Sequence, residues 1–384
     1  MIDSRTHSFW CMDDWMQWAS CRNQPYRLPS QVVVEACSSE CNMVVSDYRR
    51  RVCGIDTNAL AAEQAVVDWF RRLHFVDFGC FHGEFVSGSS EAVLTVLWRC
   101  RSFAKASGLD LEVYGTAFTH YSVLRSCKML SVAYHEVKSD EFGRISFRCL
   151  QECLSRRVQE RSLAVVILTM GLSSTGESDD LNMVCGLKSA IPKLIVHVDG
   201  AIGGLSARFL LDGLPMMDTC GVDSISCDLH KSGLCCYGSG VLCMRKELYE
   251  AAGSRVPAFS DCFDYGILGS RSSIQPVLAA EVIRRMKLRW RAMFKRQLKM
   301  RDEFVMRLSS CETVSVYSCP CAVPMVTLSV ESPSAREKIE SAFSTPFYGM
   351  PSKSNEPKFC RLFFNRQNNL KSALSAADMI RNMV

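Results

Sequence analysis

The segment His197-Val198-Asp199-Gly200-Ala201 closes an apolar run that begins at Leu194, and it predicts a buried strand with an acidic residue at its end. Further along the chain, Asp228-Leu229-His230-Lys231 follows a second short strand pattern and precedes the small residues Gly238-Ser239-Gly240. In open α/β sheets, ligands bind beyond the carboxyl ends of the strands. Asp199 and Lys231 are therefore both expected at the ligand-binding edge of one sheet.

The sequence around these two segments alternates short apolar runs with helical patterns, which predicts parallel strands joined by helices. The run at 163–172 is apolar almost throughout, which is typical of a fully buried parallel strand. Strand patterns occur at 113–114, 164–169, 194–198, 224–226 and 240–244. The fold class that we expect is α/β, with a mostly parallel central sheet and helices on both faces.

We predict three parts along the chain. Residues 1–58 form an arm suited to dimerisation, in which Trp10, Trp15 and Trp18 recur near helical spacing. Residues 59–270 form a large domain, which starts with an amphipathic helix at 59–73. Residues 271–384 form a long linking helix, at 276–308, and a small C-terminal α/β domain with strands near 325–330 and 361–364 and a closing helix at 370–383. The apolar stripe of the linking helix recurs every four residues, at Leu278, Val282, Met286, Trp290, Phe294 and Leu298.

Composition is that of a soluble globular enzyme, with 384 residues, 48% hydrophobic and 22% charged. The net charge of +5 does not predict nucleic-acid binding, and we interpret the basic face of the 276–308 helix as solvated surface. The 21 cysteines lack the spacing of a metal site and indicate free thiols in a reducing, cytoplasmic compartment. The N-terminus lacks a signal-peptide pattern, and the longest apolar run is too short to span a membrane.

The lysine, the acidic residue and the small residue after it together suit pyridoxal 5′-phosphate. The aldehyde of this cofactor needs an amine, such as that of Lys231, to form a Schiff base. Its pyridine nitrogen needs a buried carboxylate, such as that of Asp199, to stay protonated and withdraw electrons from the substrate. Ala201 is small and apolar enough for the flat ring to lie against the backbone. We therefore expect residues 59–270 to bind this cofactor.

Over about residues 60–300, the sequence resembles the fold type I, pyridoxal-phosphate-dependent amino acid decarboxylases of group II, and among them the histidine decarboxylase-like group. The resemblance depends on several motifs in the same order along the chain. They are 85–92 (FVSGSSEA), 119–123 (THYSV), 171–176 (GLSSTG) with Asp179 and Asp180, 197–201 (HVDGA), 222–226 (VDSIS) leading to His230-Lys231, and 269–271 (GSR).

The resemblance implies roles for individual residues. Lys231 corresponds to the lysine that binds the aldehyde, and Asp199 to the carboxylate that pairs with the pyridine nitrogen. His120 corresponds to the histidine that stacks on the cofactor ring and can position a substrate carboxylate or a proton donor. His230 would lie beside the phosphate or the departing carboxylate, and Ser173 corresponds to a threonine near the cofactor.

Gly88, Ser89 and Ser90 precede a helical run at 91–100, and backbone N–H groups and hydroxyls at a helix N-terminus can hold a phosphate. One position departs from the family. Where relatives have Ser or Asn three positions before the lysine, this chain has Asp228. A carboxylate beside a phosphate dianion is unfavourable unless it is protonated or turned away.

The function that we expect is decarboxylation of an L-amino acid to its amine and CO2, with histidine to histamine as the first candidate. The resemblance also implies a homodimer. Two alternatives stay open. One is another reaction on the same fold, such as a carbon–carbon lyase or a cysteine desulfurase, which would need a mobile cysteine (Cys319, Cys321 or Cys360). The other is a catalytically silent protein that kept the fold.

Overall fold

The computed structural model describes residues 43–44, 58–157, 162–191, 193–252, 254–255, 263–264, 267–268, 270–272, 274–319, 323–350, 354–365 and 368–384. The predicted arm, 1–58, lies outside these residues apart from strand β1 (Met43–Val44) and the first residue of helix α4 (Asn58–His74). Strand β1 pairs antiparallel with β11 (Ser270–Arg271). The prediction that the arm forms a dimer interface stays a prediction.

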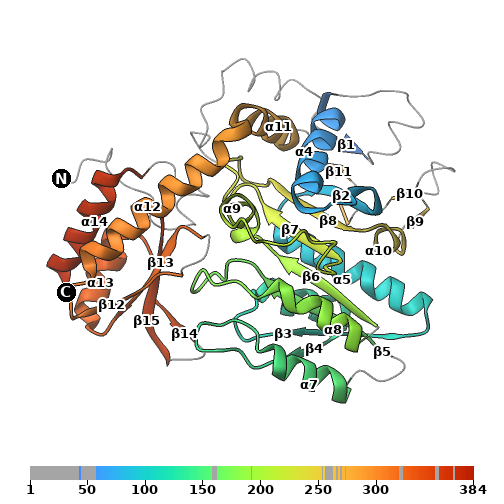
Figure 1. Ribbon diagram of the computed structural model, residues 1–384, viewed down its shortest axis with the longest axis horizontal. Helices are drawn as coiled ribbons and strands as arrows, with labels where there is room; N and C mark the ends of the chain where they lie inside the picture. Colours follow the sequence, from blue (N-terminus) through green and yellow to red (C-terminus); the bar gives the residue numbers. More distant parts are fainter. Residues whose placement is uncertain are drawn as a thin grey trace.

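A seven-stranded sheet forms the centre of the molecule (Figure 1). Its strands, in the order β2-β8-β7-β6-β5-β3-β4, are β2 (Phe81–Val86), β8 (Gly240–Arg245), β7 (Ser224–Asp228), β6 (Leu194–Asp199), β5 (Ser162–Thr169), β3 (Asp110–Gly115) and β4 (Ala133–Glu136). All five predicted strands are present, and the pairs from β7 through β4 are parallel. Strand β8 runs antiparallel to both of its neighbours. The mostly parallel sheet is therefore confirmed.

Helices cover both faces of this sheet, because the central strands are apolar on both sides. In β5, Leu163, Val165 and Ile167 face a core formed with α5 (Ser89–Ala106), α6 (Tyr121–Leu130) and α10 (Lys246–Glu250). The alternate residues Ala164, Val166 and Leu168 face a second core, formed with α4, α7 (Phe147–Arg157), α8 (Val184–Ala190), α9 (Gly203–Leu210) and α11 (Ile274–Met286). The uninterrupted apolar run thus corresponds to a strand between two helical layers.

The prediction of one continuous helix over 276–308 is wrong. Helix α11 ends at Met286, a 3-10 turn η4 (Lys287–Arg289) follows with Lys287 at φ 38°, and α12 (Trp290–Leu308) begins. Helix α11 packs against α4 of the large domain, whereas α12 packs against α9 and then α14 of the small domain. Because the buried residues on either side of the break keep their spacing, the apolar stripe gave no signal of the turn.

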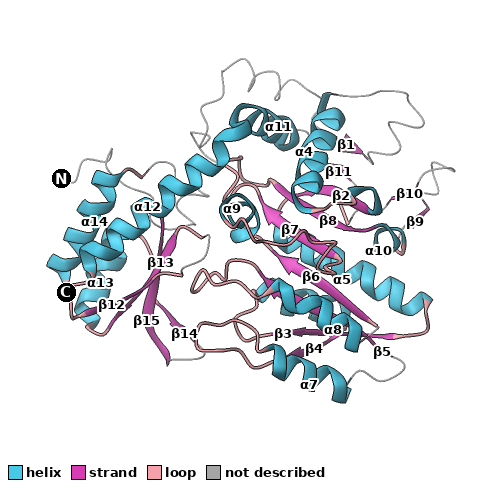
Figure 2. Cartoon of the chain, in the orientation of Figure 1, coloured by secondary structure: helices cyan, strands magenta, loops and turns pink. Residues whose placement is uncertain are grey.

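The C-terminal part contains a separate antiparallel sheet in the order β12-β13-β15-β14. Its elements are β12 (Val314–Tyr317), β13 (Met325–Val330), α13 (Pro333–Phe343), β14 (Tyr348–Met350), β15 (Ser354–Phe363) and α14 (Leu370–Met383). Figure 2 shows α12 leading from the large sheet to this smaller one, which has its own apolar core. The predicted strands and closing helix are confirmed.

The remaining short elements are η2 (Phe78–Cys80), η3 (Leu181–Met183), β9 (Ser254–Arg255) and β10 (Phe263–Asp264). Within the described ranges, none of the helices combines the length and the apolar character that crossing a membrane requires.

Thirteen described cysteines are free thiols, as predicted, but Cys319 is disulfide-bonded, which corrects the prediction at that position.

His74, the last residue of α4, is a buried ionisable group that makes stability depend on pH. Its ring lies 4.4 Å from that of Phe70, and neither ring nitrogen has a hydrogen-bond partner among the described residues. Burial, with a smaller contribution from Arg208, lowers the pKa of His74 to about 3. The folded state therefore keeps this imidazole neutral at pH values where the unfolded chain already binds a proton.

We expect His74→Phe to reduce the loss of stability in acid. Below the unfolded-state pKa of about 6.5, the unfolded chain binds a proton at His74 that the folded protein does not bind. The free energy of unfolding therefore falls by roughly 1.4 kcal/mol per pH unit until the folded-state pKa is reached. Phenylalanine fills a similar volume and has no group that binds a proton. Urea unfolding from about pH 7 down to pH 5 would show a shallower decline for the variant than for the wild type. An identical decline in both proteins would contradict this account of His74.

Candidate active site

The strand order brings three segments from distant parts of the sequence to one edge of the large sheet. Strands β6 and β7 are parallel with Asp199 opposite Ser226, so the loops after both strands lie side by side. Strand β8 places Gly240 opposite Asp228 of β7 and opposite Val86 of β2. The start of α5, which follows β2, therefore lies next to the end of β7.

Lys231 lies one turn beyond the end of β7, and its backbone N–H donates to the carbonyl of Asp228. Its side chain is 18% exposed, and Nζ lies 2.8 Å from Oδ2 of Asp228. Burial alone would lower the pKa of Lys231, but the ion pair with Asp228 and the nearby charge of Asp199 raise it above its ordinary value. The amine is therefore held in its charged form by a carboxylate of this chain.

Asp199 is buried at the end of β6, where its Oδ1 accepts a hydrogen bond of 3.1 Å from the backbone N–H of Ala201. Burial raises the pKa of this carboxyl, and the positive charge of Lys231 acts in the opposite direction. The backbone N–H of Gly200 donates to the carbonyl of Ser226, and a Cβ at position 200 would lie 2.8 Å from that oxygen. The glycine therefore allows the close approach that positions Asp199 and the half-buried Ala201.

His120 is the N-cap residue of α6, and its Nδ1 lies 2.8 Å from the hydroxyl of Ser122. Burial, followed by the charge of Lys231, lowers the pKa of His120 to about 4. The imidazole is therefore neutral near pH 7. The charge of Asp228 acts on this pKa in the opposite direction to that of Lys231.

His230 is buried beside Lys231, and its Nδ1 lies 2.9 Å from the carbonyl oxygen of Ser239, to which it donates. Its Nε2 faces Oδ2 of Asp228 at 3.7 Å. Burial lowers the pKa of His230, and the charge of Asp228 acts in the opposite direction. The hydrogen bond to Ser239 fixes the orientation of the ring.

The predicted phosphate-binding residues differ in their surroundings. The backbone N–H and the hydroxyl of Ser89 both donate to Oδ1 of Asp228, at 2.6 and 2.8 Å. A Cβ on Gly88 would lie 3.2 Å from the ring of His230, so this glycine packs against the cluster. Ser90 is exposed on the first turn of α5, and within the described residues its side chain makes no hydrogen bond to the others.

Ser173 lies in the loop after β5, where its carbonyl accepts a hydrogen bond of 3.0 Å from the guanidinium of Arg361 in β15. The positive charge of Arg361 also acts on both His120 and Lys231. Sequence reasoning missed this arginine. A charged residue inside the apolar strand pattern of 359–363 was the available signal, but nothing in the sequence showed that the small sheet meets the edge of the large one.

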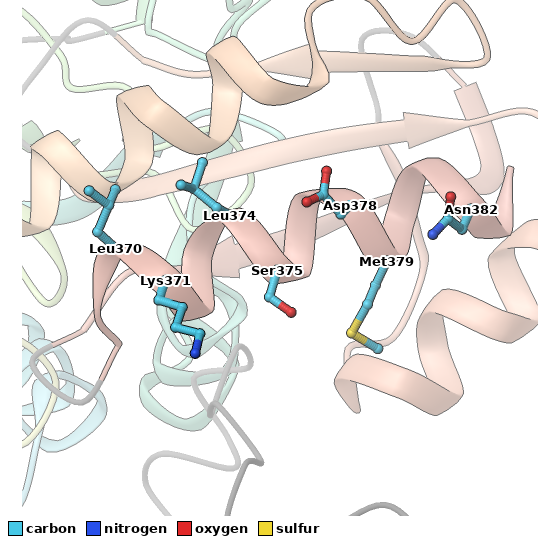
Figure 3. A pocket seen from close by; sticks show the side chains of 7 residues that line it. All are labelled: Leu370, Lys371, Leu374, Ser375, Asp378, Met379 and Asn382. Atoms are coloured by element: carbon cyan, nitrogen blue, oxygen red, sulfur yellow. The ribbon is translucent and has the colours of Figure 1, made fainter.

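A separate surface hollow of about 690 Å³ lies along one side of α14 (Figure 3). Its lining residues, from Leu370 to Asn382, all belong to this helix and include none of the cluster around Lys231. Among the residues that the structure describes, no group of three or more His, Cys, Asp or Glu side chains is arranged to hold a metal ion. The cluster around Lys231 is therefore the candidate active site.

Comparisons with known proteins agree with this geometry. The pyridoxal-dependent decarboxylase conserved domain matches residues 59–252, half of the chain. The chain is 26% identical over 221 residues to histidine decarboxylase of Solanum lycopersicum, covering 56% of this chain and 51% of that protein. It is 25% identical over 261 residues to histidine decarboxylase of Morganella morganii, covering 67% of each. It thus spans between half and two thirds of these relatives.

The fold is that of solved decarboxylases. Glutamate decarboxylase of Lactobacillus brevis superimposes with a TM-score of 0.78 at 18% identity, covering 100% of this chain and 89% of that one. At this identity the likeness shows the fold alone, and the fold confirms the fold type I prediction.

Pyridoxal 5′-phosphate is the cofactor of this family, and the residues of this chain fit its reactive end. The amine of Lys231 and the buried carboxylate of Asp199 lie at the same edge of the sheet. The phosphate end differs, because the donors of Ser89 are already bonded to Asp228. From the domain match, and with the fold and these residues in agreement, the chain belongs to the family of pyridoxal-dependent decarboxylases.

Proposed function

We propose that this chain decarboxylates an L-amino acid to its amine and CO2, using pyridoxal 5′-phosphate held by Lys231. The observation that carries the proposal is the buried carboxylate of Asp199 at the end of β6 beside the 18% exposed amine of Lys231, which follows the neighbouring parallel strand β7. The charge of the lysine also helps to keep His120 neutral. A buried carboxylate near an amine suits a ligand that is cationic at one end and carries an aldehyde.

Each residue has a definite task in this mechanism. When bound, the cofactor supplies an electron sink for the bond broken at the substrate Cα. The amine of Lys231 would hold the cofactor through its aldehyde. Asp199 keeps the ring nitrogen protonated, since a buried carboxylate favours a nearby cation.

His120 has two proposed tasks, to cover one face of the ring and to hold a proton near Cα. Its low pKa leaves a neutral imidazole, which can accept or relay a proton near pH 7. His230 is held by its bond to the carbonyl of Ser239, and it lines the end of the site beside Asp228.

The substrate within this class is a further proposal. Relatives of comparable identity are named as decarboxylases of histidine, tryptophan and serine. Histidine is our first candidate. Arg361 brings a positive charge from β15 to the site and is suited to orient a substrate carboxylate.

A desulfurase reaction is not favoured. Of the three candidate cysteines, Cys319 is disulfide-bonded and Cys360 is fully buried in the core of the small domain. Burial also raises the pKa of Cys360 well above that of a free thiol, which opposes the thiolate form. Cys321 lies outside the described residues. A carbon–carbon lyase remains the second candidate on this fold, since which Cα bond breaks depends on the pocket.

The test is product analysis by mass spectrometry after incubating the cofactor-loaded full chain with each common L-amino acid in turn. We expect one amino acid to yield its amine with release of CO2. Recovery of every amino acid unchanged, or conversion to a keto acid or a side-chain cleavage product, would overturn the proposal. An aldehyde split from a hydroxylated substrate would favour the lyase.

We also propose that the protein is a cytoplasmic homodimer. The free thiols at thirteen described cysteines are consistent with a reducing compartment. The dimer rests on the resemblance to fold type I enzymes, and light scattering of the purified protein would give its mass in solution.

A further inference from the structure

Asp228 occupies a position where the family resemblance places a phosphate-binding hydroxyl or amide. The residue is the last of β7 and is buried. Its Oδ1 accepts two hydrogen bonds from Ser89, one from the backbone N–H at 2.6 Å and one from the hydroxyl at 2.8 Å. Its Oδ2 lies 2.8 Å from Nζ of Lys231. Both oxygens of the carboxylate are therefore engaged by the groups expected to bind the cofactor.

The donors that Asp228 uses are those of a helix N-terminus. Ser89 is the first residue of α5, and the N-cap residue, Gly88, offers no side chain to satisfy the free N–H groups. Such a position favours an anion, because unpaired N–H groups and the helix dipole point toward it. In this chain the anion already present is the side chain of Asp228 itself.

The carboxylate is held there in its charged form. Burial by itself would raise the pKa of Asp228, but Lys231, His230 and the hydroxyl of Ser89 together bring it below its ordinary value. A phosphate dianion at Ser89 would meet this negative charge at close range. Two like charges that share one set of donors compete, and one of them must move or be neutralised.

We propose that Asp228 acts as an internal anion that replaces the cofactor phosphate at Ser89, so that this chain gains little affinity from the phosphate group. The proposal rests on cofactor attachment at Lys231, as proposed above. It makes Asp228 a determinant of cofactor selection: pyridoxal 5′-phosphate and unphosphorylated pyridoxal should bind with similar affinity, because the group that distinguishes them finds its donors taken.

Asp228 has a second effect, which the experiment must separate from the first. Its ion pair keeps Lys231 protonated, and a protonated amine does not attack an aldehyde. Removing the carboxylate should therefore favour capture of both aldehydes. This common gain cancels when the affinity for pyridoxal 5′-phosphate is divided by the affinity for pyridoxal, and the ratio reports on the phosphate position alone.

The test is a titration of the full chain with each aldehyde, followed by borohydride reduction and mass spectrometry of the peptide that contains Lys231. The variants are Asp228→Ser, which offers a hydroxyl donor, and Asp228→Asn, which keeps the shape and removes the charge. Asp180→Asn is a matched control, since it makes the same change of residue at the same edge of the sheet. Asparagine keeps the N-cap bond of this exposed residue, so the fold should be retained.

We expect the affinity ratio to rise at least tenfold in Asp228→Ser, to rise less in Asp228→Asn, and to stay at the wild-type value in Asp180→Asn. Adding Ser89→Ala to Asp228→Ser should remove most of this rise in the ratio, because the phosphate then loses the hydroxyl donor of Ser89. A ratio in both Asp228 variants within twofold of wild type, with both aldehydes still captured, would overturn this inference and leave the proposed function intact. Capture of neither aldehyde by any of these proteins would overturn both.

Discussion

Lys231→Ala is expected to abolish covalent capture of pyridoxal 5′-phosphate and to lower turnover by more than about 10³-fold, the scale of losing a group that forms a covalent bond with the reacting molecule. The side chain of Lys231 lies beside the buried residues Asp228 and His230, and neither of them carries an amine that could replace it. The measurement is the mass of the protein after incubation with the cofactor and borohydride, together with the rate of amine formation.

Two further variants make the Lys231 experiment specific. Lys231→Arg keeps a positive charge beside Asp228 but lacks the nucleophilic amine, so it should fold like the wild type and still fail to capture the cofactor. Lys246→Ala removes an exposed lysine at the start of α10, away from the site, and should behave as wild type in both measurements. Covalent attachment of the cofactor at another lysine in Lys231→Ala would show that the site is wrongly assigned.

Asp199→Asn is expected to lower kcat by roughly 10²–10³-fold, the usual cost of removing one preorganised electrostatic group from an active site. Asparagine has the same shape and can still accept the hydrogen bond from Ala201, so the backbone around it should be retained. It carries no charge, however, and cannot hold a proton on the ring nitrogen. The loss should therefore appear in the rate of the chemical step, measured in single turnovers with saturating cofactor.

The control for Asp199→Asn is Asp180→Asn, which makes the same chemical change at an exposed N-cap and should leave the rate unchanged. The temperature of unfolding should also be compared, because Asp199 is buried with a raised pKa and its replacement by a neutral amide should not destabilise the fold. Turnover of Asp199→Asn within threefold of wild type would mean that the carboxylate does not act on the ring.

Local patterns predicted the large domain well, because its strands are buried on both faces and its helices are buried on one. The apolar run at 163–172 could be a strand between two helical layers, and β5 is one. Strands β2 and β4 were not predicted. Both are partly exposed and interrupted by polar residues such as His82, Glu84 and His135, so their apolar pattern is weak.

The break at Lys287 was also beyond the reach of sequence reasoning. The buried positions continue at the same spacing through Met286 and Trp290, and a periodic stripe shows which residues face a core but not whether the backbone between them stays α-helical. Trp290 and Phe294, beyond the turn, still pack in the core of the large domain, and the small-domain core begins at Met300, so the change of core falls within α12 and not at the turn.

By itself, the sequence determined the elements and the chemistry: buried parallel strands, a carboxylate and a lysine at strand ends, and motifs that resemble one cofactor-dependent family. Only the tertiary structure decided which groups meet. Ser89 and Asp228 are separated by 139 positions and are joined because β8 lies antiparallel between β2 and β7, which brings the ends of those two strands to one edge. Strand order depends on the packing of the whole sheet, and no local pattern of residues encodes it.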